Sequence, residues 1–238
     1  MELDNKIALV TGAGRGIGRA IALALAKAGA KLALAARNQH ELESVAQEIQ
    51  KLNTEALVLP TDLRDEMQTR RMVMKTVEQF GALHILVNNA GLGYFRSVAE
   101  MTTAEWDEMF AVNMRAIFIA TNEAIPHLRK AGESFVINIA SLAGKNTFVN
   151  GGGYTATKWA VRAFSQCLML EERKNGMRVL VVCPGSVDTS FATRSSGSPH
   201  SGKKEIVRPE DVAETIVMSI KMPQRTMVSE IDIRPSNP

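Results

Sequence analysis

Short aliphatic runs alternate along this chain with longer stretches in which apolar residues recur every three or four positions. Runs that are apolar throughout are typical of strands buried on both faces of a sheet. They predict strands at residues 7–10, 32–35, 56–59, 85–87, 135–139, 179–182 and 228–233. The longer stretches have the spacing of amphipathic helices and predict helices at residues 15–28, 39–51, 65–80, 104–128, 154–173 and 209–220.

The alternation of strand and helix predicts an α/β fold, because parallel strands are joined by right-handed crossovers whose helices cover both faces of the sheet. We expect one doubly wound Rossmann-type domain over residues 1–238, with a parallel sheet of about seven strands. Residues 193–204 are rich in serine and glycine and predict a mobile loop over about 189–204. Four glycines stand where predicted helices end and favour left-handed turns there: Gly29, Gly81, Gly132 and Gly176.

The composition of the chain argues against nucleic-acid-binding, membrane-spanning and metal-binding proteins. The chain of 238 residues is 45% hydrophobic and 22% charged, as soluble globular proteins are. Its net charge of +3 is scattered, and the longest basic run is Lys203–Lys204, so we expect no nucleic-acid surface. Its apolar runs are too short for a membrane span, and a strand starts too early for a signal peptide, which predicts a cytoplasmic protein. Cys167 and Cys183 have no partner at metal-ligand spacing, so we expect reduced structural cysteines and no metal site.

A glycine-rich turn joins the first predicted strand to the first helix. It places Gly12, Gly14, Gly16 and Gly18 around Arg15 and Ile17. Glycines there permit a tight turn and close approach of the backbone to a pyrophosphate, which the helix N-terminus attracts. The alternative is a turn that only links strand to helix. Its position in a strand–helix–strand unit favours dinucleotide binding.

The end of the second predicted strand indicates which dinucleotide binds. An acidic residue is expected there for an adenine ribose, yet residues 34–38 contain no carboxylate. Arg37, next to Asn38, can instead offer a bidentate guanidinium to a 2′-phosphate, and Arg15 can reach the same place. We therefore expect NADP(H) as the cofactor; alternatively, Arg37 is a surface cation beside the following helix.

Tyr154 and Lys158 are four residues apart and share one helical face. Lowering a phenol pKa of about 10 by about three units takes about 4 kcal/mol. An ammonium about 5 Å away, at an effective dielectric of about 20, supplies roughly 3 kcal/mol. The pair alone is also common on helix surfaces. Ser141, at the end of the fifth predicted strand, adds a hydroxyl that can hold a carbonyl oxygen for protonation.

Taken together, the motifs resemble the short-chain dehydrogenase/reductase family over nearly the whole chain. In chain order they are the turn at 11–18, Asp62, residues 88–91, Asn113, Ser141, Tyr154 with Lys158, and residues 184–189. The resemblance implies that Tyr154 is the acid–base, Ser141 positions the substrate oxygen, Lys158 also holds the nicotinamide ribose, and Asn113 supports a water-linked proton relay. It assigns further cofactor contacts to Asp62, Leu63, Asn89, Ala90, Gly91, Pro184, Gly185, Val187 and Thr189.

The substrate is less well defined by the sequence. Its walls are expected in the segments that follow Gly91, Ser141 and Pro184 and in the loop at 189–204. The residues there suit an apolar or mixed carbonyl compound and include Leu92, Tyr94, Phe95, Leu142, Asn146, Phe148 and Val149. Alternatively, Tyr94 and Phe95 only pack under the loop. Arg194 and Lys203–Lys204 could attract an acidic substrate or carrier, or form a solvated face. The chain is most similar to 3-oxoacyl-carrier-protein reductases, which implies NADPH-dependent reduction of a ketone or 3-oxoacyl thioester.

Two other functions stay open: an NAD-dependent alcohol or hydroxy-acid dehydrogenase working toward oxidation, and a non-catalytic cofactor-binding regulator. The resemblance also implies a homotetramer or homodimer built on the helices at 104–128 and 154–173 and on the C-terminal strand. The alternative is a monomer with a thick core.

Overall fold

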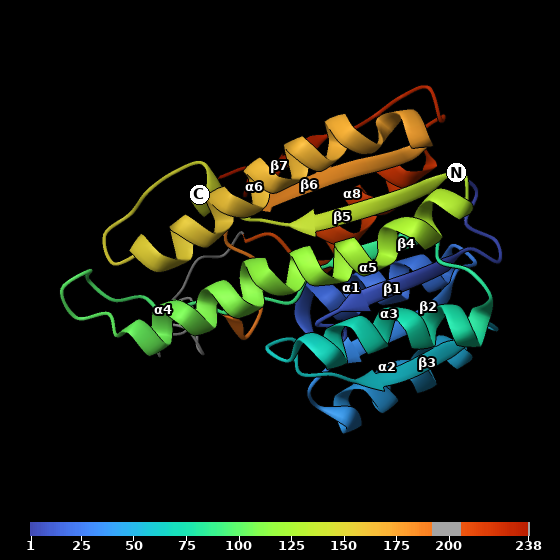
Figure 1. The fold of residues 1–238 in the computed structure, drawn as a ribbon, viewed down its shortest axis with the longest axis horizontal. Helices are drawn as coiled ribbons and strands as arrows, with labels where there is room; N and C mark the ends of the chain where they lie inside the picture. The colour runs from blue at the N-terminus through green and yellow to red at the C-terminus, as the bar shows by residue number, and fades with distance from the viewer. Residues whose placement is uncertain (192–205, 238) are drawn as a thin grey trace.

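The computed structural model describes residues 1–191 and 206–237, and in these it forms one parallel sheet in the order β3-β2-β1-β4-β5-β6-β7 (Figure 1). Winding reverses between β1 and β4, because β1 pairs with β2 on one side and with β4 on the other. The strands are β1 (Ile7–Thr11), β2 (Lys31–Ala36), β3 (Ala56–Pro60), β4 (Ile85–Asn88), β5 (Ser134–Ile139), β6 (Met177–Pro184) and β7 (Glu230–Ile233). This confirms the predicted doubly wound α/β fold.

Helices cover both faces of the sheet (Figure 1). They are α1 (Gly16–Lys27), α2 (Gln39–Gln50), α3 (Glu66–Phe80), α4 (Thr103–Phe110), α5 (Ala116–Lys130), α6 (Gly152–Glu172) and α8 (Pro209–Lys221). One buried cluster joins α1, α2 and α8 to the sheet, and a second joins α3, α5 and α6 to it. Because all seven strands are parallel, their carboxyl ends lie at the same edge of the sheet, together with the loops that follow them.

Two predicted elements differ from the structure. The helix expected over 104–128 is divided into α4 and α5 by a π-helical turn, η1 (Ala111–Arg115). The last strand begins at Glu230 rather than 228, because the Thr226 N–H closes a turn onto Pro223 and pairing with β6 starts only at Glu230. The other elements differ only at their ends, and the four glycines expected at helix ends all have positive φ.

Most of the expected loop at 189–204, with Arg194 and Lys203–Lys204, lies outside the described residues. Of its expected span, the structure describes residues 189–191. No helix within the described ranges is long and apolar enough to cross a membrane.

Candidate active site

The glycine-rich turn brings backbone N–H groups together at the carboxyl end of β1. Gly12 and Gly16 have φ of 65° and 54°, and a Cβ at Gly18 would lie 2.2 Å from the Gly12 carbonyl oxygen. Among the described side chains none caps the N-terminus of α1, and its first turn contains no acidic residue. A free, positively polarised helix end beneath a close-packed glycine turn fits a dinucleotide pyrophosphate.

Hydrogen bonds connect the segment after β4 to this turn. The Thr11 hydroxyl accepts hydrogen bonds from the backbone N–H groups of Asn89 (2.9 Å) and Ala90 (3.1 Å). The Asn89 side chain donates to the carbonyls of Thr11 (2.9 Å) and Gly12 (3.3 Å). The predicted cofactor residues of the two strands therefore lie together at the point where the winding reverses, which is where open α/β sheets bind ligands.

At the far end of the turn, the two candidate phosphate-binding arginines have different surroundings. Arg15 is bound to Glu41 on α2 at 3.2 Å, whereas Arg37 is exposed and forms no ion pair within the described residues. Asn38 is occupied in capping α2, because its side chain accepts from the Glu41 N–H. Arg37 is thus the guanidinium that is free to meet an added phosphate at this edge of the sheet.

Asp62 follows β3 and is bound by Arg64, whose guanidinium contacts it at 2.5 Å. This hydrogen bonding lowers the pKa of the Asp62 carboxyl, and the charge of Arg37 lowers it further. Leu63 is half-buried and packs on the cluster that joins α3, α5 and α6 to the sheet, while Ile17 packs on the cluster that joins α1, α2 and α8 to it. The charge of Arg37 thus reaches Asp62, although the ion-pair partner of Asp62 is Arg64.

The segment after β6 lies close to the glycine turn. A Cβ at Gly16 would lie 3.2 Å from Cγ2 of Thr189. Val187 pairs with Val207 as an isolated bridge, and the Gly185 N–H donates to Ile233 in β7. Pro184 ends β6. These contacts bring the predicted carboxamide-binding segment to the same edge as the pyrophosphate cradle.

Tyr154 and Lys158 lie on α6, and both are buried. The Lys158 ammonium is 5.7 Å from the Tyr154 ring centroid and donates a 2.9 Å hydrogen bond to the Ile139 carbonyl at the end of β5. Ser141 follows β5 directly and accepts from the Ala143 N–H at 3.1 Å. A Cβ at Gly91 would lie 3.4 Å from Asn113 Oδ1 and 3.6 Å from Lys158 Nζ. The structure therefore brings these predicted residues into one site.

The electrostatics of the pair differ from the sequence-based expectation. Burial raises the pKa of Tyr154 to about 12, against a smaller lowering by hydrogen bonding with Ser141. Burial also lowers the pKa of Lys158 to about 8. The expected net lowering of the phenol pKa by Lys158 is therefore wrong for the protein alone, since the charge arithmetic left out desolvation of both groups. At neutral pH Tyr154 is a protonated donor.

Asn113 occupies the π-helical turn and is fully buried. Its side-chain NH₂ donates to the Leu92 carbonyl (2.8 Å) and to the Thr157 hydroxyl (3.1 Å), and its oxygen accepts from the Leu92 N–H (2.9 Å). The extra residue of the π turn thus places Asn113 between α6 and the segment after β4. Such turns inside α-helices are frequent at functional sites.

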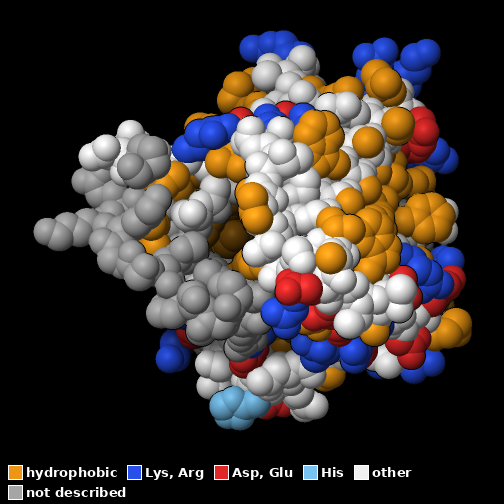
Figure 2. Space-filling view, turned by 90° about the vertical axis from the view of Figure 1, so that its left-hand side faces the viewer, with side chains coloured by type: hydrophobic (Ala, Val, Ile, Leu, Met, Phe, Trp, Pro, Cys, Tyr) orange, Lys and Arg blue, Asp and Glu red, His pale blue; other side chains and the backbone are white. Residues whose placement is uncertain are grey.

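Aromatic rings surround Tyr154. Phe95 meets it edge-on at a centroid distance of 5.5 Å, Phe191 lies at 5.7 Å, and Phe148 packs on Phe95 at 5.7 Å. Figure 2 shows hydrophobic side chains gathered around a hollow on the face toward which the strand ends point. Phe191 lies in the segment after Pro184 and in the loop at 189–204, both of which were expected to contribute to the substrate walls, and the structure places its ring against Tyr154.

The other expected wall residues are distributed unevenly. Leu92 and Tyr94 pack on the cluster around Tyr154, although the Tyr94 hydroxyl donates to Glu108 at 2.6 Å. By contrast, Leu142 packs against a neighbouring cluster, Asn146 is exposed, and Val149 is 88% exposed. Neither Leu142 nor Val149 belongs to the apolar cluster packed around Tyr154.

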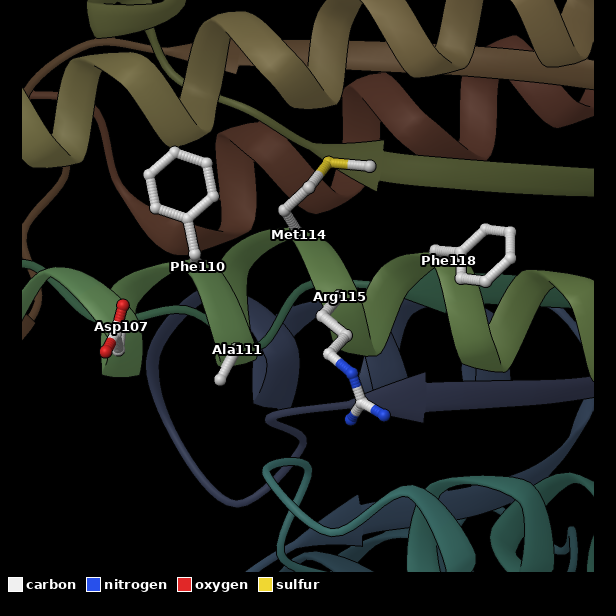
Figure 3. Close-up of a pocket in the computed structure, with 6 residues that line it drawn as sticks. All are labelled: Asp107, Phe110, Ala111, Met114, Arg115 and Phe118. Carbon is white, nitrogen blue, oxygen red and sulfur yellow. The ribbon is translucent and has the colours of Figure 1, made fainter.

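A second hollow lies along α4, η1 and α5 (Figure 3). It is lined by Asp107, Phe110, Ala111, Met114, Arg115 and Phe118. The surface around it includes large apolar side chains, among them Phe118, which is 49% exposed, and Trp106, which is 41% exposed. Exposed apolar area of this kind on two neighbouring helices is typical of a protein–protein interface.

Comparison with known proteins identifies relatives over almost the full length. Residues 6–198 match the family described as short chain dehydrogenase. An uncharacterized oxidoreductase of Staphylococcus aureus strain USA300 is 35% identical, with 98% of each chain covered. An alcohol dehydrogenase of Thermococcus sibiricus in complex with 5-hydroxy-NADP is 33% identical, with a TM-score of 0.91 and 99% and 98% coverage. A 3-ketoacyl-(acyl-carrier-protein) reductase of Brucella melitensis in complex with NADH is 30% identical, with a TM-score of 0.89 and 97% of each chain covered.

Proposed function

Because the chain belongs to the short-chain dehydrogenase family and is an oxidoreductase, we propose that it reduces a carbonyl compound to an alcohol with NADPH. The observation that carries the proposal is a buried, protonated Tyr154 beside Lys158 and Ser141, at the edge of the sheet that also holds the glycine turn. A proton donor, a cation and a hydroxyl next to a dinucleotide cradle support proton delivery to a carbonyl oxygen.

Each side chain then has a defined task. The bound nicotinamide supplies the hydride. Ser141 donates a hydrogen bond that holds the substrate oxygen, and Tyr154 donates its proton to that oxygen. Lys158 stabilises the phenolate left behind and holds the nicotinamide ribose, while Asn113 supports the water through which the proton is replaced.

The cofactor residues divide the dinucleotide between them. The N–H groups of the turn at 12–18 hold the pyrophosphate, and Arg37, with Arg15, holds the 2′-phosphate. The remaining contacts are assigned to Asn38, Asp62, Leu63, Asn89, Ala90, Gly91, Pro184, Gly185, Val187 and Thr189. Structures of relatives contain NADP or NADH, and Arg37, which is exposed and has no ion-pair partner in residues 1–191 and 206–237, favours NADP(H) for this chain.

The aromatic surroundings of Tyr154 support an uncharged, apolar or mixed carbonyl compound as substrate. Phe95, Phe148 and Phe191 offer ring faces and edges rather than charges. A 3-oxoacyl thioester fits these walls through its acyl chain, and one relative is a 3-ketoacyl-(acyl-carrier-protein) reductase. The competing function, oxidation of an alcohol with NAD⁺, requires tighter binding of NAD⁺ than of NADPH.

The test is a carbonyl panel followed by loss of NADPH absorbance. It comprises 3-oxoacyl thioesters of increasing chain length, aromatic ketones, cyclic ketones and 3-oxo acids with a free carboxylate. We expect turnover of uncharged apolar members and stronger binding of NADPH than of NADH. Preference for NAD⁺ with alcohols, and no reduction of any panel member, would contradict the proposal.

We also propose that the chain forms a homodimer or homotetramer through the outer faces of α4, α5 and α6. Phe118 and Trp159 are about half exposed on these helices. Sedimentation should give a multiple of the 25.9 kDa chain mass, and Phe118→Glu should shift the equilibrium toward monomer. A parental protein that sediments at the chain mass would contradict the assembly.

A further inference from the structure

Four charged side chains form a compact cluster behind the catalytic residues. Lys145 follows the 3-10 turn η2 (Leu142–Gly144), Arg162 lies on α6, and Glu230 and Asp232 lie on β7. The Lys145 ammonium is 2.5 Å from each carboxylate. The Arg162 guanidinium binds Glu230 through two nitrogens, at 3.0 and 3.1 Å. The cluster thus joins three elements that are far apart in the sequence.

The cluster also contacts the backbone of the turn that follows Ser141. A third Arg162 nitrogen donates a 2.7 Å hydrogen bond to the Gly144 carbonyl. Gly144 is pressed against α6, because a Cβ there would lie 2.8 Å from the Lys158 carbonyl oxygen and 3.0 Å from Arg162 Cδ. Since η2 is capped by the Ser141 hydroxyl, the place of that hydroxyl relative to Lys158 depends on how η2 sits on α6.

A metal site is the other explanation of these groups. Cys183, Glu230 and Asp232 bring three possible ligand atoms within 4.8 Å of one another. Both carboxylates, however, already contact Lys145. Glu230 also binds Arg162, and Asp232 also binds Arg234 at 3.2 Å, so three cations face the two anions. Burial raises the pKa of the Cys183 thiol to about 11, which keeps it protonated and a poor ligand. The geometry therefore favours a structural clamp.

We propose that Arg162 and Lys145, held by Glu230 and Asp232, are positioning residues that fix Ser141 against Tyr154 and Lys158. The proposal rests on the role given above to Ser141. Within the cluster Arg162 contributes most, because its guanidinium binds both Glu230 and the Gly144 carbonyl. A displacement of about 1 Å at a reacting group can reduce rate by about 100-fold. We therefore expect Arg162→Met to lower kcat by about 10- to 100-fold.

A double-mutant cycle tests this with NADPH and the panel carbonyl that is turned over fastest. Arg162→Met, Ser141→Ala and the combined variant are compared for kcat and KM. We expect Arg162→Met to lower kcat while KM for NADPH is unchanged, and to have little further effect once Ser141 is alanine. Arg162→Lys should restore little activity, because a compact ammonium does not reproduce the planar fork that binds both Glu230 oxygens and the Gly144 carbonyl.

Arg129→Met is the matched control. Arg129 also forms a bidentate pair with a glutamate of α6, Glu172, at 2.8 and 2.6 Å, but among the described residues it donates no hydrogen bond to η2. It should lower thermal stability and leave kcat at the parental value. Equal kcat losses in the two variants, or full additivity of Arg162→Met with Ser141→Ala, would overturn the proposal.

Amide hydrogen exchange gives a readout that needs no turnover. The N–H groups of residues 143–146 are bonded within the turn, so their exchange should be faster in Arg162→Met than in Arg129→Met. Unchanged exchange would overturn the clamp. If Ser141→Ala keeps the parental kcat, the proposed catalytic role of Ser141 fails instead, and the exchange rates separate that result from failure of the clamp.

Discussion

Replacing Lys158 by methionine isolates the electrostatic part of the proposed mechanism. Methionine keeps an unbranched side chain in the buried space and removes the charge. The ammonium is 5.7 Å from the centre of the Tyr154 ring. At an effective dielectric of about 20, a charge at that distance stabilises the phenolate by about 3 kcal/mol, or about two pKa units.

The consequence is a large loss of rate. If most of this stabilisation is present in the transition state, kcat for carbonyl reduction falls by about 100-fold at pH 7. The pH dependence has a defined sign, because burial lowers the pKa of Lys158 to about 8. As pH rises through that value the ammonium loses its proton, so the parental rate should decline on the alkaline side, and the Lys158→Met rate should not.

The assay is NADPH oxidation from pH 6 to 10 at saturating carbonyl. Lys158→Arg serves as the control, since it keeps the charge and changes the shape. Because Lys158 also donates to the Ile139 carbonyl at 2.9 Å, thermal unfolding of each variant is recorded as well. A Lys158→Met enzyme that is stable, binds NADPH and turns over within a factor of about three of the parent would refute the electrostatic reasoning.

Two further predictions address the cofactor and the fold. Arg37→Asp should raise KM for NADPH by about 10- to 100-fold, because it removes a charge-assisted contact with the 2′-phosphate. It should lower KM for NADH, because the new carboxylate can accept a hydrogen bond from the ribose 2′-hydroxyl. Arg71→Asp, at an exposed position of α3, is the control, and an unchanged KM for NADPH would exclude Arg37 from the site. Arg178→Met should lower the free energy of unfolding in urea by about 2–4 kcal/mol, because Arg178 is 3% exposed, donates to the Met222 carbonyl at 2.8 Å and pairs with Glu133 at 2.6 Å. A loss no larger than the roughly 0.5 kcal/mol expected for an exposed arginine would contradict this.

Much of the fold and of the site could be predicted from the sequence because the signals are local. Apolar runs and helical spacing predict where the strands and helices lie, and the glycine turn follows β1 as expected. Tyr154 and Lys158 share a helical face by spacing alone, and Ser141 lies at a strand end. Residues at the carboxyl ends of parallel strands must meet, so local prediction was sufficient to assemble them.

The rest depends on contacts between distant residues. The π turn arises where Asn113 binds Leu92 and Thr157, which are 21 and 44 positions away. The direction of the Tyr154 pKa shift depends on burial by surrounding elements, which spacing does not reveal. Likewise, the hydroxyl of Tyr94 donates a hydrogen bond to Glu108 on α4. Tyr94, expected in the wall of the substrate site, therefore also connects two elements of the fold.

The most direct test of the central claim uses the two tyrosines of the chain as a matched pair. Tyr154→Phe and Tyr94→Phe each remove one hydroxyl and keep the ring. With the best carbonyl of the panel, the account predicts that Tyr154→Phe lowers kcat by at least about 100-fold while NADPH still binds, and that Tyr94→Phe stays near the parent. Equal turnover by Tyr154→Phe and the parental enzyme would contradict the account.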